Sequence, residues 1–308
     1  MAVEITLNGE TRRLDRGLSV RGLLERLGLD PAKIAVERNL EIVPRSAYDH
    51  VALADGDRWR RSMASLWRVL AIVVIVMSPL RLLSVGAGMA DSTFREVIPM
   101  MPQIMRETFA GRVWTWRLAT ALLLALAAWI PAPGRAATAL IFAISAALLA
   151  LQSITSHAID KGAFAIAAHF AHQAAAGMWI GALVSLLIGA TYGHAGADWL
   201  RSATPRVSMI AGWSVAVLIV TGAIRAWDAL GLHLDLLVNS IYGRTLLWKV
   251  GTAATVILIG GYNRYRLVGS VEEPSARVAL IRNVAVECGL LAVVLGWSVV
   301  LSNTPPPH

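Results

Sequence analysis

The apolar residues of this chain are collected into long blocks after residue 60, and each block is close to the roughly 20 residues that cross a bilayer as a helix. This pattern predicts about seven membrane spans. They lie at residues 66–86, 113–130, 136–155, 163–190, 207–229, 245–264 and 283–301. The first block is interrupted by Pro79 and Arg81, and Arg81 must reach an interface or a protein partner.

Residues 1–60 follow a different pattern, with many charges and no long apolar run. Apolar and polar residues alternate in "VEITLNGETRRLD" about the pair Asn8-Gly9, which predicts a β-hairpin. Ser19 then caps a helix that ends at Gly28. Its apolar face consists of Val20, Leu23, Leu24 and Leu27. The stretch "KIAVERNLEIV" predicts a second pair of strands.

The composition agrees with this division. The chain is 56% hydrophobic and 16% charged, with a mean hydropathy of +0.59, whereas soluble domains have about 25% charged residues. We therefore expect an all-α polytopic membrane helix bundle over residues 61–308. A small α+β domain of the ubiquitin-like (β-grasp) kind is expected over residues 1–60.

The basic residues predict the orientation in the membrane. With a cytoplasmic N-terminus most arginines between the spans lie on the cytoplasmic side, where the positive-inside rule places them. The outer side keeps Arg95, Arg106, Arg112 and Lys161. An odd number of spans then puts the C-terminus outside. Topology also accounts for the net charge of +8, and no nucleic-acid-binding motif is present.

Histidines in the apolar stretch "AAHFAHQAAAGMWIGAL" are the first candidate chemistry. His169 and His172 lie about 60° apart on one helical face. With the predicted topology, His157 lies at the outer end of the preceding span, so three imidazoles meet on the outer side. Each of them has a plainer interpretation, a hydrogen bond to a neighbouring helix.

Methionines of the predicted outer loop add soft ligands. Met100, Met101 and Met105 lie in "VIPMMPQIM", with Met89 upstream. Thioethers favour Cu(I) and imidazole suits copper in either oxidation state, although methionine also fills apolar gaps without a function. The lone Cys288 excludes a thiolate relay. No phosphate-binding loop or other catalytic motif is found, so no enzyme activity is expected. Glu287, about one turn inside the last predicted span, is expected to pair with Arg264 at the cytoplasmic end of the sixth.

The N-terminal segment resembles the ThiS/MoaD sulfur-carrier family at "NGETRRL", "AVERNLEIVPRSAY" and "ADGDRW". The resemblance implies a β-grasp fold. In that family the chemistry needs a free C-terminal Gly-Gly, but "DGDRWRRSMASLW" stands at this place and continues into the first span. We therefore expect the fold to be kept as a cytoplasmic adapter or regulatory unit without the carrier chemistry.

From about residue 109 to its end the chain resembles the CopD copper-resistance and copper-import family. The stretches that carry the resemblance are "FAGRVWTWRLA", "TSHA", "HQAAAGMWIGAL", "TGAIRA", "IYGRTLLWKV", "GYNRYRL", "NVAVECGLL" and "NTPPP". It implies a protein of about eight spans that moves copper across the bacterial inner membrane, often beside a periplasmic CopC copper carrier. His157 and His172 match the family's histidines, whereas His169 lies outside its pattern. This chain has one predicted span fewer, and its soluble part lies on the other side of the membrane.

Together these features predict copper uptake as Cu(I) or Cu(II) through an outer site of His157, His169 and His172, supplied by the methionines or by a CopC-like carrier. Copper and membrane lipid are the expected partners. Two alternatives remain open: a haem-binding electron-transfer protein with histidine axial ligands, and a metal-free membrane scaffold.

Overall fold

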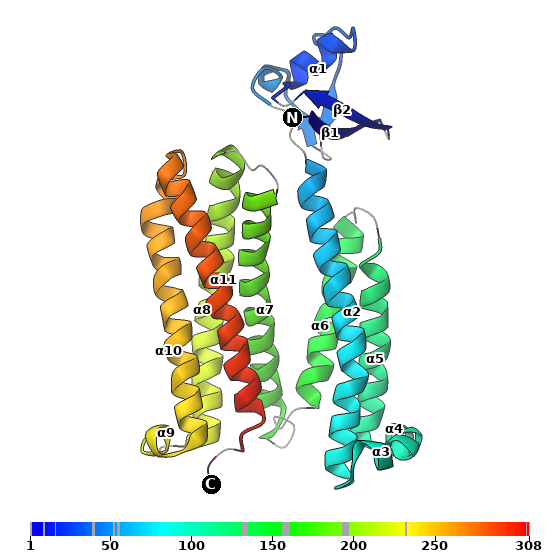
Figure 1. Ribbon diagram of the computed structural model, residues 1–308, viewed down its shortest axis with the longest axis vertical. Coiled ribbons are helices and arrows are strands. Elements are labelled where there is room, and N and C mark those ends of the chain that lie inside the picture. Colours follow the sequence, from blue (N-terminus) through cyan, green and yellow to red (C-terminus); the bar gives the residue numbers. More distant parts are fainter. Residues whose placement is uncertain are drawn as a thin grey trace. The chain divides into compact units, whose positions relative to one another are not determined.

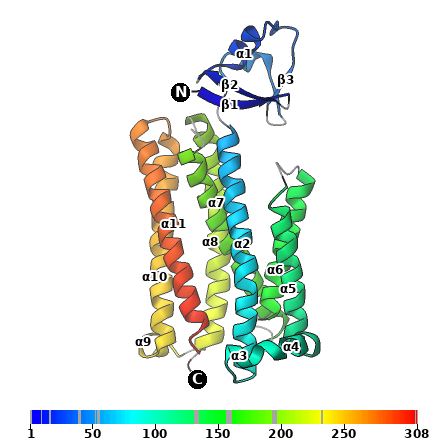
Figure 2. The same ribbon diagram turned by 45° about the vertical axis from the view of Figure 1, so that its right-hand side comes forward.

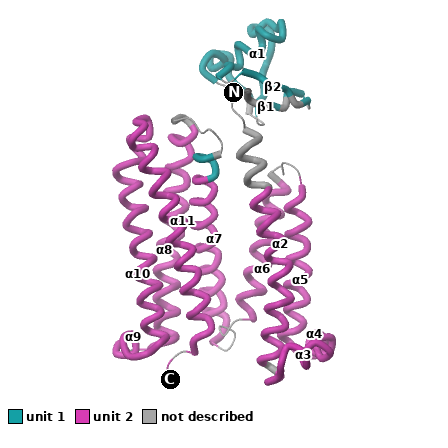
Figure 3. The backbone as a smooth tube through the Cα atoms, in the orientation of Figure 1, with its two compact units in different colours: residues 1–62, 188–195 teal, residues 63–187, 196–308 magenta. Residues whose placement is uncertain are grey.

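The computed structural model describes the chain apart from residues 1, 9, 16, 39–40, 52, 54–55, 131–134, 156–160, 193–196, 232, 306 and 308. The contacts between Cα atoms divide it into two compact units, shown in Figure 3. One unit holds residues 1–62 with 188–195, and the other holds residues 63–187 with 196–308. Each unit is described by itself.

The first unit has the predicted order of two strands, a helix and two strands. Its elements are β1 (Ala2–Leu7), β2 (Glu10–Asp15), α1 (Val20–Arg26), β3 (Val36–Arg38), β4 (Glu41–Val43) and the 3₁₀ turn η1 (Arg45–Ala47). Both strand pairs are antiparallel, and in the described residues they form two separate two-stranded sheets. The side chain of Ser19 accepts a hydrogen bond from the Gly22 N–H, and Gly28 follows α1 with a φ of +70°, so both predicted ends of this helix are confirmed.

The core of the first unit consists of Val20, Leu24, Val43 and Tyr48. Tyr48 is 1% exposed, and its hydroxyl accepts from the Val36 N–H at 3.1 Å and donates to the Ile34 carbonyl at 2.9 Å. The side chain that follows η1 therefore holds the segment that leads into β3 and satisfies two half-buried backbone groups.

The second unit is helical in its described parts, as Figure 1 shows. Its helices are α2 (Gly56–Met89), α3 (Phe94–Val97), η2 (Ile98–Met100), α4 (Met101–Glu107), α5 (Phe109–Ala127), α6 (Arg135–Ile154), α7 (Ala163–Tyr192), α8 (Ala197–Leu230), α9 (Leu236–Asn239), α10 (Ile241–Tyr262), η4 (Asn263–Leu267), η5 (Val268–Ser270) and α11 (Pro274–Ser302).

Six helices of the described residues are long and apolar enough to cross a membrane: α2, α6, α7, α8, α10 and α11. The predicted span at 113–130 lies on α5, which is helical over 19 residues but carries Arg112 and Arg117. Pro79 lies inside α2 without ending it, and residues 65–88 of this helix are apolar enough to span, so the predicted first span at 66–86 is confirmed. The Pro-rich region after α2 forms only the short helices α3, η2 and α4, none of which can span a bilayer.

Two groups of helices pack within this unit. Helices α7, α8, α10 and α11 run side by side in Figures 1 and 2. Helices α2, α5 and α6 form the other group, in which the Arg68 guanidinium lies 4.7 Å from the centre of the Trp129 ring. Arg117 of α5 stacks 3.7 Å over Trp114 and reaches Thr155 at 3.4 Å, which keeps its charge off the lipid-facing side.

One helix-start motif occurs twice. Before α5, the Thr108 hydroxyl accepts from the Gly111 N–H and donates to the Ile104 carbonyl. Before α10, Ser240 makes the same two bonds with the Gly243 N–H and the Leu236 carbonyl. In both places a short helix, α4 or α9, folds back on the long helix that follows, and glycine is needed because a Cβ would lie 2.1 Å from the carbonyl oxygen.

Candidate metal site

His172 lies on α7 and is held against α8. Its Nδ1 is 2.9 Å from the Thr221 hydroxyl, and that hydroxyl donates to the Val217 carbonyl at 2.6 Å. Because the single hydroxyl proton of Thr221 goes to Val217, its oxygen must accept from His172, so Nδ1 carries the ring proton. The other nitrogen, Nε2, then keeps a free lone pair, which is the arrangement of a metal-ligating imidazole fixed by its second nitrogen.

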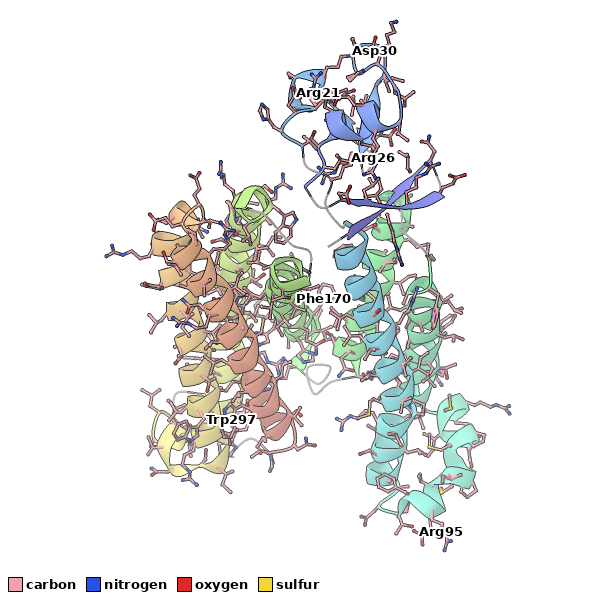
Figure 4. The ribbon with its side chains drawn as sticks, turned by 45° about the horizontal axis from the view of Figure 1, so that its top comes forward. Arg21, Arg26, Asp30, Arg95, Phe170 and Trp297 are labelled. Atoms are coloured by element: carbon pink, nitrogen blue, oxygen red, sulfur yellow. The ribbon has the colours of Figure 1, made fainter. Side chains whose placement is uncertain are left out.

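His169 lies one turn earlier on α7, and Phe170 between them is labelled in Figure 4. Its Nε2 is 3.1 Å from Gln173 Nε2, while His169 Nδ1 and Gln173 Oε1 are buried without a hydrogen-bond partner in the described residues. A half-turn of the amide group makes Oε1 the acceptor of the Nε2–H and leaves the Nδ1 lone pair free. The two histidines then each present one unprotonated nitrogen.

The surroundings of these imidazoles are positively charged. Both Arg225 of α8 and Lys249 of α10 lie within electrostatic range of His172, and Arg225 is also within range of His169. In a medium of low dielectric constant, like charges at short range oppose the binding of a cation. The pair of histidines is therefore suited to hold a metal ion weakly, and an ion that is in transit must be able to leave.

The structure joins only part of the predicted site. His157 lies outside the described residues. Met101 packs with its sulfur toward Gly86 of α2, Met100 is 45% exposed on η2, and Met105 is half-buried on α4. No contact in the described residues links these methionines to the histidines of α7. In the same residues there is also no group of three or more His, Cys, Asp or Glu side chains that could hold a metal ion.

Two features were missed by the sequence reasoning. The first is Thr221, whose only signal was its place in "TGAIRA". The second is a cavity of about 570 Å³ between α7, α8, α10 and α11, in the half of the bundle away from the histidines. Its wall includes Glu287, which lies 13 residues into α11, about 20 Å along the helix axis, and so is deeper than the sequence predicted.

The expected pairing of Glu287 with Arg264 is wrong. The Glu287 carboxylate accepts from the Asn263 amide at 2.6 Å, and Asn263 in turn accepts from Asn283 at 2.8 Å. Arg264 donates instead to the Ser208 hydroxyl at 2.8 Å. The π-helical turn η4 accounts for this, because the change of helical period there redirects Asn263 into the bundle, where it is 5% exposed.

Comparison with known proteins assigns separate parts of the chain. Residues 5–58 match the ThiS family. Over 56 residues the chain is 50% identical to a thiazole synthase of Paramagnetospirillum magneticum, and over 56 residues it is 43% identical to one of Magnetococcus marinus. Each match covers 18% of this chain and 17% of the relative, so the chain spans about a sixth of the length of these curated proteins and the match concerns the N-terminal segment alone.

The membrane part matches two further families, while no solved structure matches the chain. Residues 40–165 match the family described as copper resistance protein D-like, N-terminal domain, which extends the resemblance well before residue 109. Residues 201–301 match the family described as copper resistance protein D. Together with the six apolar helices found among the described residues, these matches identify a multi-pass membrane protein that is similar to the copper resistance protein D (CopD) family, with a segment similar to the ThiS family at its N-terminal end.

Proposed function

We propose that this protein takes up copper across the bacterial inner membrane, and that His172 and His169 hold the ion where it enters the bundle. The family supplies the cargo, because its members are copper resistance and transport proteins. The observation that carries the proposal is the hydrogen bond from His172 to Thr221, which orients the ring and leaves Nε2 free. A neutral imidazole with one nitrogen fixed and one free suits copper in either oxidation state.

The predicted topology places these histidines in the outer half of the membrane. Copper would arrive there from a CopC-like carrier or from the segment that holds Met100, Met101 and Met105, and His157 would complete the entry site. Two or three imidazoles without a carboxylate or thiolate give a site of moderate affinity. That property serves a carrier better than a storage protein, because the ion has to move on.

Copper content and thermal stability of purified variants test this proposal. His172→Ala and His157→Ala should each lower the copper bound per protein after copper exposure, and His169→Ala should lower it less. If the histidines only join helices, the same substitutions should instead lower the melting temperature, by an amount worth about 1 kcal/mol, with the copper content unchanged. If both His157→Ala and His172→Ala bind as much copper as the wild type, the proposed copper site is wrong.

The haem alternative meets a geometric difficulty. Axial ligands of one haem approach its iron from opposite faces, and two histidines three residues apart on α7 point to the same side. A haem would therefore need its second ligand from outside α7, and the candidate His157 is placed by the predicted topology too close to the water layer to share a haem with a deeper histidine. The absorption spectrum of the purified protein decides the question, because a stoichiometric Soret band requires haem, and copper transport requires none.

We further propose that residues 1–60 form a cytoplasmic domain with an adapter or regulatory role, and that the membrane domain covers residues 61–308. Sulfur-carrier chemistry needs a free Gly-Gly terminus, whereas here helix α2 starts at Gly56 and continues without a break to Met89. Incubation with a carrier-activating enzyme, ATP and a sulfur donor should leave the mass of the protein unchanged. A mass gain on residues 1–60 would contradict this assignment.

A further inference from the structure

The cavity of the α7–α8–α10–α11 bundle contains a carboxylate in an unusual position. Glu287 is 2% exposed near the middle of α11, and one of its oxygens, Oε1, accepts the hydrogen bond from Asn263. The other oxygen, Oε2, lies 3.3 Å from the place where a Cβ on residue 260 would stand. Because residue 260 is a glycine, α10 leaves room beside this oxygen, on the wall of the cavity.

No cation of the described residues forms an ion pair with this carboxylate, whose hydrogen-bond partner is the neutral Asn263 amide. Arg264 and Tyr265 are the titratable groups that η4 adds to the cavity wall, and Arg264 is engaged with Ser208. The wall residues from α7 and α8, which include Trp179, Thr204 and Met209, carry no charge. On its own helix Glu287 is followed by Cys288, which is neutral as a thiol.

An ionised carboxylate in this setting is costly. Burial of a charge inside a bilayer without a partner carries a large desolvation penalty, and such a group remains neutral until a cation arrives. The two asparagines do not change this, because an amide donates a hydrogen bond but brings no charge. A proton or a cation must therefore accompany Glu287, and the cavity offers space for either.

We propose that Glu287 is a cation-binding group through which the copper ion passes, and that it releases a proton when the ion binds and takes a proton up when the ion leaves. The step is balanced, because the ion replaces the proton on Oε2 and the proton goes to water in the cavity. Copper is held there by oxygen ligands, Glu287 Oε2 together with water in the cavity. This inference rests on the proposed transport of copper.

One face of α7 connects this cavity to the histidines. Trp179 stands two turns after His172 on nearly the same side of the helix, is 5% exposed and lines the cavity. Leu183 and Leu186 continue that buried face along the cavity wall. On the facing helix, the buried hydroxyls of Thr221 and Thr204 mark the histidine level and the cavity level. The two sites are thus successive positions along one helix pair.

Infrared difference spectroscopy of the full-length protein in detergent tests the proposal directly. Copper is added as Cu(II), and in a second sample as Cu(I) kept reduced with ascorbate, with Na⁺ alone as the comparison. In the wild type, copper should remove the C=O stretching band of one protonated, buried carboxyl group and release about one proton to an indicator dye. Glu287→Gln, which keeps the shape and the hydrogen bond from Asn263, should lose both signals. The control Glu273→Gln, at the exposed start of α11, should keep them.

Copper flux in proteoliposomes separates this inference from the proposed function. Glu287→Gln should still bind copper at the histidines but transport it at least tenfold more slowly than the wild type. If Glu287→Gln keeps the loss of the carboxyl band and the proton release, or if Na⁺ alone produces them equally, Glu287 is not the copper-binding group. The proposed function still stands in that case if His172→Ala is defective in copper transport. If copper causes no change of a carboxyl band in the wild type, that result alone overturns the inference.

Discussion

Replacement of Thr221 by valine removes the hydrogen bond with His172 and the bond that the hydroxyl donates to the Val217 carbonyl within α8. The two side chains have nearly the same shape, but valine cannot accept the proton of His172 Nδ1, which in the wild type lies 2.9 Å from the hydroxyl. The ring then loses the contact that fixes its proton on Nδ1 and its orientation toward α8. Copper binding should weaken because Nε2 is no longer prepared as the ligand atom.

Typical values for such contacts give the expected size of this effect. A hydrogen bond between membrane helices contributes about 0.6 kcal/mol on average and up to about 1.7 kcal/mol. At about 1.4 kcal/mol for each factor of ten, this corresponds to binding that is roughly 3-fold to 20-fold weaker. Loss of a group that orients a metal ligand typically costs about 10-fold to 100-fold. We therefore expect a loss of about tenfold in affinity, with a small decrease in melting temperature.

Competition with a chelator of known copper affinity measures the change. The control is Thr245→Val on α10, because Thr245 and Thr221 are both 7% exposed and both donate to the carbonyl four residues earlier. Thr245→Val should leave the affinity within a factor of two of the wild type. If Thr221→Val binds copper as tightly as Thr245→Val although His172→Ala binds it weakly, the Thr221 hydroxyl does not prepare His172 as a ligand.

Three further predictions concern other parts of the chain. Gly243→Ala should destabilise the protein by about 1–3 kcal/mol, because the new Cβ would lie 2.1 Å from a backbone oxygen of α9, whereas Gly251→Ala, with open space around it, should not; thermal melting shows the difference. Tyr48→Phe should speed hydrogen exchange at the half-buried Val36 amide by at least tenfold, since it leaves that donor without the Tyr48 hydroxyl as its partner, and an unchanged rate would contradict the role of the hydroxyl. Reporters fused to the two ends should report opposite sides of the membrane, with the N-terminus cytoplasmic, and an even number of spans would make them report the same side.

The fold was largely predictable because its determinants are local. Blocks of apolar residues locate the spans, and the alternation before Asn8 together with the cap at Ser19 predicts the first unit. The sequence misplaced the depth of Glu287 because α11 starts at Pro274, nine residues before the predicted span. A search for apolar residues does not detect the start of this helix, because its first residue is a proline and its first turn is polar.

The site was less predictable because it depends on contacts between helices. Helical spacing alone placed His169 and His172 on one face, but their partners Gln173 and Thr221 lie 4 and 49 residues away. The methionines were grouped with the histidines because the predicted topology puts both on the outer side. A shared side of the membrane does not require contact, and the structure places Met101 against α2.

Copper flux into proteoliposomes that contain the full chain and a trapped copper indicator tests the central claim, that copper crosses the membrane through the histidines of α7. The wild type should load the vesicles well above protein-free liposomes, His172→Ala should fall to near that background, and His233→Ala, at an exposed position outside the spans, should match the wild type. Equal flux in the wild type and in His172→Ala, or no flux above the background in the wild type, would contradict the account.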